Sequence, residues 1–352
     1  MKRFGIIGCG KIAQRHANLL GKNEIEGATL SAVCDVNSEK ADKFAKDNGV
    51  KAFYDAQEML KSGSVDVVSI LTPSGFHARN ILEIVHHGKP IVVEKPMALR
   101  LNEADEVIEA CDKHKVKLFI VKQNRFNRPV MKLREAVENG RFGRLILGTI
   151  RLRWCRPQAY YDEASWRGTW AHDGGVLTNQ ASHHIDLLVW MMGEVESVFA
   201  KTTTALANIE AEDTAVVTIK FRNGALGVIE ATTAARPRDL EGSLSVMGEK
   251  GSVVVGGFAA NKLETWQFEE EEPSDAEIFE THGCNPSHPF GYSHKAYYEH
   301  VVDCIVNDRR QLVDGLGGRK SLELITAIYE SVETGREIPL RFNPKKCRLG
   351  LG

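Results

Sequence analysis

The chain has 352 residues, of which 43% are hydrophobic and 26% are charged. At roughly 150 residues per domain this length predicts two domains, each large enough to bury its own hydrophobic core. Lys and Arg number 45 against 47 for Asp and Glu, which leaves a formal net charge of −2. A chain so close to neutral has no bulk electrostatic attraction for nucleic acid or an anionic membrane. No apolar run approaches the roughly 20 residues that span a bilayer.

The seven cysteines are scattered along the chain, and none is spaced as CxxC. This spacing argues against a disulfide framework or a structural zinc site and favours a reducing compartment. The glycine-rich segment that follows Phe4 begins too early for a signal peptide. We therefore expect a cytoplasmic protein with no metal, no nucleic-acid partner and no membrane partner.

The N-terminal segment has the pattern of a dinucleotide-binding fold. Residues 4–7 form an apolar run that ends in a GxGxxA turn, and residues 12–20 have the spacing of an amphipathic helix. A second apolar run, residues 30–34, ends at Asp35. This order of strand, glycine turn, helix, strand and acid matches the dinucleotide fingerprint.

The fingerprint predicts a role for each residue of the turn. Gly8 permits a tight turn, and Gly10 lets the backbone approach a pyrophosphate. The pyrophosphate would lie at the helix N-terminus, beside Lys11 and Ile12. Asp35 would accept hydrogen bonds from the adenosine ribose and repel a 2′-phosphate, which favours NAD over NADP.

Strands continue to alternate with helices as far as residue 121. We expect strands over residues 65–71, 90–93 and 117–121, and a helix over residues 102–114. This alternation predicts a doubly wound parallel sheet, in which ligands bind at the carboxyl ends of the strands. Besides Gly8 and Asp35, the residues that fall at these ends are Thr72, Glu94, Lys95 and Gln123.

Lys95 is a candidate for proton transfer. Desolvation at the end of a buried strand lowers the pKa of a lysine, which then exchanges protons near neutrality. Pro96 restricts the backbone of Lys95 and so fixes where its amine points. The alternative is that Glu94 and Lys95 are an ordinary surface ion pair.

After residue 121 the pattern becomes that of consecutive strands joined by short turns, which predicts a mostly antiparallel sheet. The expected strands are residues 145–154, 197–204, 214–221, 224–232, 244–247 and 251–255, with helices over 129–139 and 321–333. We therefore expect an α/β protein. Residues 1–121 would form an N-terminal Rossmann domain with a doubly wound parallel sheet. Residues 122–352 would form an α+β domain with an open, mostly antiparallel sheet for substrate binding and oligomerisation.

Residues 179–193 have helical periodicity and carry the second candidate for proton transfer. On such a helix Asn179, His183 and Asp186 share one face, and the apolar residues lie on another. The pairing of Asn179 with His183 four residues later favours a functional histidine. The alternative is a structural or solvated histidine, which is how we interpret His184.

Taken together, these motifs resemble the glucose–fructose oxidoreductase, inositol dehydrogenase and MocA (Gfo/Idh/MocA) family. The motifs that carry the resemblance are Gly8-Cys9-Gly10, Thr72-Pro73-Ser74 with His77, Glu94-Lys95-Pro96, Gln123-Asn124-Arg125, and Gly174-Gly175 with Asn179 and His183. The resemblance implies a nicotinamide cofactor, oxidation or reduction at a sugar carbon, and proton chemistry by Lys95 and His183, which we expect to meet at the nicotinamide. It also implies homodimers or homotetramers.

A second set of motifs resembles the branch of this family that oxidises UDP-N-acetylglucosaminuronic acid at carbon 3 for bacterial surface polysaccharides. These motifs are Arg156-Pro157-Gln158, Tyr160-Tyr161-Asp162, Trp166-Arg167-Gly168-Thr169-Trp170, Asp173-Gly174-Gly175, Asn179-Gln180-Ala181-Ser182-His183 and Asn208-Ile209-Glu210. Much of the family has Asp in place of Asn179, and an amide cannot be a general base. The segment 289–294 matches the branch only in part.

Such a substrate carries a diphosphate and a carboxylate, which call for arginines. Arg151 and Arg153 are two apart on an expected strand and so project to one face. The expected substrate contacts are Lys95, Arg153, Arg156, Tyr160, Asn179, Gln180 and His183, with Trp166 and Arg167 as further cofactor contacts. The alternatives are an inositol or free-sugar dehydrogenase, which needs no diphosphate clamp, and a non-catalytic NAD-binding regulator.

Overall fold

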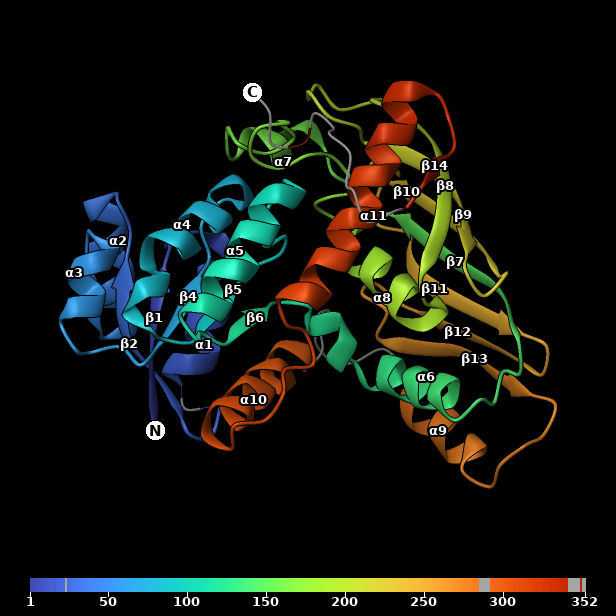
Figure 1. Ribbon diagram of the computed structural model, residues 1–352, viewed down its shortest axis with the longest axis horizontal. Coiled ribbons are helices and arrows are strands. Elements are labelled where there is room, and N and C mark those ends of the chain that lie inside the picture. The colour runs from blue at the N-terminus through green and yellow to red at the C-terminus, as the bar shows by residue number, and fades with distance from the viewer. Residues whose placement is uncertain (23, 285–291, 341–348, 350–352) are drawn as a thin grey trace. The chain divides into compact units, whose positions relative to one another are not determined.

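The computed structural model describes residues 1–352 apart from 23, 285–291, 341–348 and 350–352. The chain divides into two compact units (Figure 1). Unit 1 comprises Met1–Val121 and His294–Arg319, and unit 2 comprises Lys122–Ser293 and Lys320–Gly352. Each unit contains one sheet of its own among the described residues.

Unit 1 is built on a six-stranded parallel sheet with the order β3-β2-β1-β4-β5-β6. Its strands are β1 Lys2–Ile7, β2 Ala28–Cys34, β3 Lys51–Phe53, β4 Val67–Ile70, β5 Ile91–Val93 and β6 Leu118–Ile120. Its helices include α1 Lys11–Gly21, α2 Ser38–Asn48, α3 Ala56–Lys61, α4 His77–Ile84 and α5 Leu101–Lys113. The order changes direction between β1 and β4, which is the point where doubly wound sheets bind ligands. The predicted Rossmann sheet is confirmed.

Residues 294–319 belong to unit 1, whereas the sequence-based division assigned all of residues 122–352 to one domain. Helix α10, Ser293–Val306, packs Tyr298 edge-on against Phe4 of β1, with the ring centroids 5.6 Å apart. Ile120 of β6 donates its backbone N–H to the carbonyl of Val313 at 3.3 Å. Periodicity identifies an amphipathic helix but does not say which sheet the helix covers.

Unit 2 is built on an eight-stranded sheet with the order β13-β12-β11-β7-β10-β9-β8-β14. Its strands are β7 Leu145–Arg153, β8 Val195–Thr203, β9 Thr214–Phe221, β10 Leu226–Thr232, β11 Glu241–Gly248, β12 Gly251–Gly256, β13 Lys262–Phe268 and β14 Ile338–Pro339. β10 pairs with β7 in parallel, and the other neighbours are antiparallel. The predicted mostly antiparallel sheet is confirmed.

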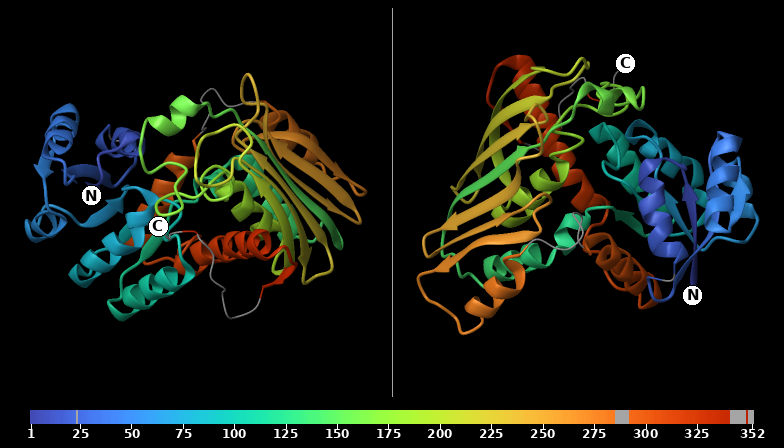
Figure 2. Two further views of the ribbon diagram at one scale, coloured as in Figure 1. Left: turned by 90° about the horizontal axis from the view of Figure 1, so that it is seen from above. Right: turned by 180° about the vertical axis from the view of Figure 1, so that it is seen from behind.

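The two faces of this sheet differ. Helix α8, Ser182–Met192, lies against one face (Figure 2), and a Cβ on Gly148 of β7 would come within 2.6 Å of Met192. The opposite face, which we call the outer face, exposes Val216 of β9 and Leu226 of β10, at 52% and 57% of their full surface. Such alternation of buried and exposed side chains is typical of an antiparallel sheet with one covered face.

The remaining helices of unit 2 are α6 Arg128–Glu138, α7 Gln158–Asp162, α9 Asp275–His282 and the long α11 Gly315–Thr334, whose first residues belong to unit 1. Within the described part of the chain, no helix is both long enough and apolar enough to span a membrane. The periodicity predicted that Asn179 lies on this helix. Helix α8 instead begins at Ser182, so Asn179 lies in the turns before it.

Candidate active site

The two glycines of the first turn serve different purposes. Gly8 has φ +97°, and a Cβ there would lie 2.8 Å from the backbone nitrogen of Thr72, so the close approach of β1 and β4 requires glycine. Gly10 has an ordinary φ of −85°, and no heavy atom lies within 4 Å of its missing Cβ. Nothing in the described chain itself requires glycine at Gly10, so the bare backbone there fits a ligand that comes close to it.

The same turn leads into α1, whose N-cap is Gly10 with no side-chain cap and whose first turn carries no acidic residue. A helix N-terminus of this kind attracts phosphate through its backbone N–H groups and its dipole. Asp35, at the end of β2, accepts the N–H of Cys9 at 2.8 Å and that of Asn37 at 2.9 Å. Each carboxylate oxygen keeps a further lone pair, which suits ribose hydroxyls. These residues fit NAD.

His77 was expected to contact the cofactor, but its side chain contacts the protein backbone instead. Its ring is buried, with 1% of its surface exposed. Nδ1 lies 2.6 Å from the carbonyl oxygen of Pro96, and Nε2 lies 2.8 Å from that of Thr72. Both ring nitrogens are therefore occupied, and His77 connects two of the loops at the strand ends. Pro73 and Ser74 lie at the start of the short 3-10 helix η1, Ser74–Phe76.

Glu94 is buried, with 8% of its surface exposed, which rules out the surface ion pair considered above. One carboxylate oxygen lies 3.0 Å from Nε2 of His16, and the other accepts the backbone N–H of Lys95 at 3.1 Å. Burial by itself raises the pKa of Glu94, but the hydrogen bond and charge of His16, with the charges of His294 and Lys95, lower it to about 2. Glu94 is therefore an anion next to Lys95.

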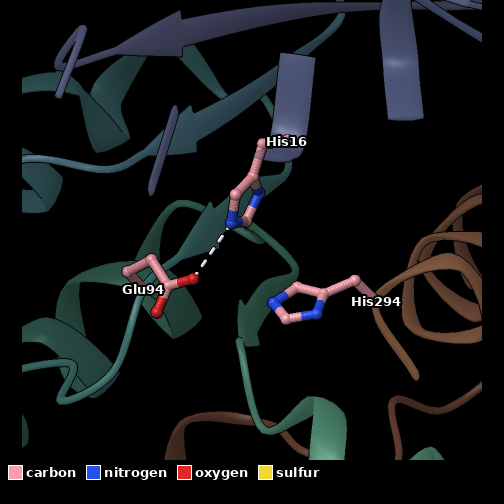
Figure 3. Close-up of side chains that lie close together, drawn as sticks. All are labelled: His16, Glu94 and His294. Carbon is pink, nitrogen blue, oxygen red and sulfur yellow. Dashed lines mark hydrogen bonds and ion pairs between the residues drawn. The ribbon is translucent and has the colours of Figure 1, made fainter. Parts of the chain in front are cut away.

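His16, Glu94 and His294 point toward one another (Figure 3). Their potential ligand atoms lie within 4.8 Å of one another, which makes them the one described group of three side chains that could hold a metal. However, Nδ1 of His16 lies 2.6 Å from the hydroxyl of Tyr298, and Nε2 lies 3.0 Å from Glu94. Because both nitrogens of His16 are engaged, we interpret the group as a hydrogen-bond network. Sequence reasoning missed His16 and His294, since their spacing is that of ordinary helix residues.

In unit 2, the predicted site residues Gln123 and His183 lie next to each other. Nε2 of Gln123 is 3.2 Å from Nε2 of His183, and His183 is partly exposed at the start of α8. His184 is buried, and burial lowers its pKa to about 4, in keeping with the structural role expected of it.

His183 and Asp186 share a face of α8, as predicted, but Asp186 has partners of its own. It is buried and accepts two hydrogen bonds from Arg125, at 2.7 and 2.9 Å, while the amine of Lys122 lies 3.8 Å away. Burial raises the pKa of Asp186, but the two cations lower it below its ordinary value. This ion pair ties the segment of Gln123 to α8 and so holds Gln123 beside His183.

Asn179 is held by Asp173, a residue to which the sequence analysis gave no role of its own. The side-chain nitrogen of Asn179 donates to Oδ1 of Asp173 at 2.6 Å, and Oδ2 accepts the N–H of Gly168 at 2.9 Å. Because a carboxylate only accepts hydrogen bonds, the amide nitrogen must face Asp173, and the carbonyl oxygen of Asn179 is turned away from it.

A buried acid, Glu212, supports the same loop. Its Oε1 accepts the N–H of Leu177 and the hydroxyl of Tyr329, both at 3.0 Å, and Tyr329 also contacts the hydroxyl of Thr178. A Cβ on Gly175 would lie 2.1 Å from the backbone oxygen of Glu212. Burial raises the pKa of Glu212 to about 7. Sequence reasoning missed Glu212, although the Gly174-Gly175 pair signalled a close approach at this position.

The predicted arginines separate into two groups. Arg153 is on the outer face, where it makes two hydrogen bonds to Glu230, at 2.6 and 2.8 Å, and lies 3.5 Å from Glu241. Arg151 shares that face and lies 3.3 Å from Glu241. Because side chains alternate along a strand, Arg153 is on the side of the sheet opposite α8, away from His183.

Arg156 and Arg167, in contrast, gather around one aromatic ring. Their guanidinium carbons lie 5.6 and 4.2 Å from the ring centre of Tyr160. The hydroxyl of Tyr160 accepts a hydrogen bond from Gln180 at 3.4 Å. Trp166 lies at the edge of this group, 5.8 Å from Arg167. The structure therefore brings together these five residues, all of which the sequence analysis had selected.

Two protein-family models match the chain. They are described as "Oxidoreductase family, NAD-binding Rossmann fold", over residues 2–122, and "Oxidoreductase family, C-terminal alpha/beta domain", over residues 134–340. Unit 1 thus contains a NAD-binding Rossmann domain, and NAD is the cofactor, as the glycine turn and Asp35 predicted.

Solved structures and curated relatives are similar over almost the whole chain. The WlbA dehydrogenase from Bordetella pertussis, in complex with NADH and UDP-GlcNAcA, is 41% identical, with a TM-score of 0.92 and coverage of 97% of this chain and 98% of that one. The WlbA dehydrogenase from Chromobacterium violaceum, in complex with the same two compounds, is also 41% identical, with a TM-score of 0.90 and coverage of 97% and 96%. The myo-inositol 2-dehydrogenase of Thermotoga maritima is 31% identical over 96% of this chain and 98% of its own length.

Proposed function

We propose that this chain, which belongs to the Gfo/Idh/MocA oxidoreductase family, oxidises the 3-hydroxyl of UDP-N-acetylglucosaminuronic acid to a ketone with NAD. The observation that carries the proposal is the 41% identity, over 97% of the chain, to two dehydrogenases described in complex with NADH and UDP-GlcNAcA. The 31% identity to an inositol dehydrogenase is lower over a similar length. We also propose that the resulting 3-keto sugar nucleotide is a precursor of bacterial surface polysaccharides.

The first turn of unit 1 holds the cofactor in this proposal. Gly8 and Gly10 place the N-terminus of α1 at the pyrophosphate, with Lys11 and Ile12, and Asp35 accepts from the ribose. The other proposed cofactor contacts are Thr72, Pro73, Ser74, Glu94, Lys95, Gln123, Trp166 and Arg167, and His77 acts through the loops it connects. When bound, NAD accepts the hydride that leaves carbon 3 of the sugar.

Lys95 and His183 carry the proton in this mechanism. As the carbon–hydrogen bond at carbon 3 gives up its electron pair, one of these two groups removes the hydroxyl proton, and the carbon–oxygen double bond forms. A positioned general base of this kind contributes about 10²–10⁴-fold in rate. The carbonyl oxygen of Asn179, which is turned away from Asp173, accepts a hydrogen bond from the substrate hydroxyl.

The cluster around Tyr160 is the proposed site for the charged part of the substrate. Arg156 and Arg167 supply the cations that a diphosphate or a carboxylate needs, and Gln180 and Tyr160 add polar contacts. Arg153 was part of the predicted clamp, but it lies on the outer face, opposite α8, where it pairs with Glu230 and Glu241. Arg156 and Arg167 also have carboxylate partners, Asp239 and Glu163, but both lie beside Tyr160. We therefore assign the anionic groups of the substrate to Arg156 and Arg167.

A panel of substrates with NAD⁺, followed by NADH absorbance, tests the proposal. We expect turnover with UDP-N-acetylglucosaminuronic acid and at least about tenfold less with UDP-N-acetylglucosamine, which lacks the carboxylate. Preferred turnover of an inositol would favour the second candidate, an inositol dehydrogenase, to which the curated relative points. Arg156→Ala discriminates further, since it weakens binding of a nucleotide sugar but not of a free sugar. No turnover of any compound would favour a NAD-binding regulator.

We further propose that two or four copies associate through the outer face of the large sheet. This face exposes Val216 and Leu226 together with the ion pairs of Arg153, a mixture that suits a subunit interface. Val216→Asp and Leu226→Asp, measured by light scattering, would reduce the mass from that of an oligomer to that of one chain. The six described cysteines are all free, which is consistent with a cytoplasmic location.

A further inference from the structure

The backbone on both sides of Lys95 is held by histidines that have no part in the proposed chemistry. Lys95 lies just after β5, which ends at Val93, and stands between Glu94 and Pro96. His16 comes from α1 and His77 from the start of α4. Both are essentially buried, with 0% and 1% of their surfaces exposed.

On the N-terminal side, the connection runs through Glu94. One oxygen of its carboxylate accepts the backbone N–H of Lys95 at 3.1 Å, and the other lies 3.0 Å from Nε2 of His16 (Figure 3). A carboxylate only accepts hydrogen bonds, so Nε2 of His16 carries the proton. Nδ1 of His16 is in turn 2.6 Å from the hydroxyl of Tyr298, which lies 3.3 Å from the hydroxyl of Ser69. Beyond Lys95, the members of this chain of hydrogen bonds, Glu94, His16, Tyr298 and Ser69, are buried.

On the C-terminal side, the connection is direct. Nδ1 of His77 lies 2.6 Å from the carbonyl oxygen of Pro96, and Nε2 lies 2.8 Å from the carbonyl oxygen of Thr72. Thr72 follows the neighbouring strand β4, whose residues Ser69 and Ile70 pair with Val92 and Val93 of β5. Carbonyl oxygens only accept hydrogen bonds, so His77 donates to both of them when its ring is protonated and to one of them when it is neutral. In either state its ring lies between Pro96 and the segment that follows β4.

We propose that His16 and His77 are positioning residues for Lys95. His16 acts through the Glu94 carboxylate and His77 through the Pro96 carbonyl, and together they fix the backbone from which the amine of Lys95 extends. The inference rests on the proposed function, in which Lys95 transfers a proton. A base that is displaced by about 1 Å costs on the order of 100-fold in rate, so fixing this backbone has a direct catalytic value.

Metal binding is the competing interpretation of His16, Glu94 and His294. A metal would have to displace the proton that His16 shares with Glu94, and metal ligands must give up such protons. Titration of the protein with Zn²⁺ and with Mn²⁺ decides between the two. Tight binding of one ion per chain that is lost in His294→Asn overturns the proposal, and no saturable binding supports it.

The kinetic test compares His16→Phe and His77→Phe with their conservative partners His16→Gln and His77→Gln. The phenylalanine keeps the ring volume and removes both nitrogens, whereas glutamine can still donate one hydrogen bond. We expect each phenylalanine variant to lower kcat about 10- to 100-fold with KM for NAD within about threefold, and glutamine to restore part of the loss. His114→Phe, on the exposed end of α5 in the same unit, should leave both values unchanged.

The decisive comparison is made in a Lys95→Met background. If His16 acts only through Lys95, then His16→Phe costs less than about twofold there, because the group that it positions is already absent. Independent losses that multiply would overturn the proposal. Lys95→Met with undiminished turnover would refute the role of Lys95 in the proposed function instead.

A measurement that does not depend on turnover distinguishes failure of the positioning proposal from failure of the proposed function. The rate at which an amine reagent labels Lys95, followed by peptide mass spectrometry, reports the position and environment of the amine in the protein alone. We expect His16→Phe and His77→Phe to change this rate more than about threefold and to leave the labelling of exposed Lys113 unchanged. Unchanged labelling of Lys95 in folded variants would show that the histidines do not position it.

Discussion

The two glycine turns of the molecule look alike in sequence, and yet they do opposite things. Gly10 in unit 1 has open space at its missing Cβ, whereas a Cβ on Gly175 in unit 2 would lie 2.1 Å from the backbone oxygen of Glu212. The first turn thus leaves room for a ligand, and the second is filled by the chain's own buried acid. The difference teaches that a missing side chain marks a binding site only where nothing in the protein occupies its place.

If this comparison is right, changes near the first turn affect binding and turnover, and changes near the second affect folding. Lys95→Met should give the largest effect, with kcat lower by about 100-fold or more because one of the two proposed proton-transfer groups is lost. The Kd for NADH, measured by fluorescence titration, should stay within about threefold. The matched control is Lys113→Met in exposed α5, which should keep full turnover; a Lys95→Met enzyme that does the same would end the role of this lysine.

Glu212 should make the folding of the protein depend on pH. Its pKa is raised by burial from 4.5 to about 7, so the folded protein binds this proton more tightly than the unfolded chain does. Stability from this group therefore falls as the pH rises from about 4.5 to about 7, by on the order of 3 kcal/mol. Urea unfolding of the protein and of Glu212→Gln at pH 5 and pH 8 measures the contribution. Equal pH dependence in both proteins would contradict it.

Gly175→Ala and Gly10→Ala test the two turns directly. Gly175→Ala forces a methyl group against the Glu212 backbone, and we expect it to lower the free energy of unfolding by about 1–3 kcal/mol. Gly10→Ala should leave stability within about 0.5 kcal/mol, because its methyl group meets no atom of the described chain. Instead it should weaken NADH binding about tenfold through contact with the pyrophosphate. Thermal unfolding and NADH titration of both variants test this assignment. A loss of stability in Gly10→Ala, or weaker NADH binding in Gly175→Ala, would contradict it.

Asp173→Asn should have the smallest effect, about tenfold or less on kcat. The amide that replaces the carboxylate can turn its oxygen toward Asn179, but the charge-assisted character of the hydrogen bond at 2.6 Å is lost. Binding of NADH should be little changed, since Asp173 is not among the proposed cofactor contacts. In Asn179→Ala the same Asp173→Asn change should have little further effect on kcat; multiplicative losses would mean that Asp173 acts elsewhere.

Much of the fold was predictable because it depends on local pattern. The apolar runs gave the strands of the parallel sheet, and the GxGxxA turn with Asp35 identified the nucleotide-binding end of that sheet. The cluster of Arg156, Tyr160 and Gln180 also came together as selected. In the parallel sheet the relevant residues are neighbours in sequence or fall at the ends of adjacent parallel strands, whereas Gln180 reaches Tyr160 from 20 residues away.

What the pattern missed depends on partners that are far away in the chain. Asp186 shares a helix face with His183, but the sequence did not show that Arg125 binds it from 61 residues away. Arg153 looked like a substrate ligand, but Glu230 occupies it from the neighbouring strand, 77 residues away. Both partners were missed for one reason, because a charged side chain that is partly buried takes the nearest opposite charge, and the sequence does not say which charge will be near.

From its sequence alone, this protein is determined to have a parallel nucleotide-binding sheet, a mostly antiparallel second sheet and a lysine at a strand end, since hydrophobic period and glycine spacing are local properties. Tertiary structure alone decided that residues 294–319 return to the first unit, and that His16 and His77 hold the backbone around Lys95. It also decided that Glu212 fills the second glycine turn. These outcomes depend on which buried polar groups satisfy one another, and that choice is made only when distant segments pack.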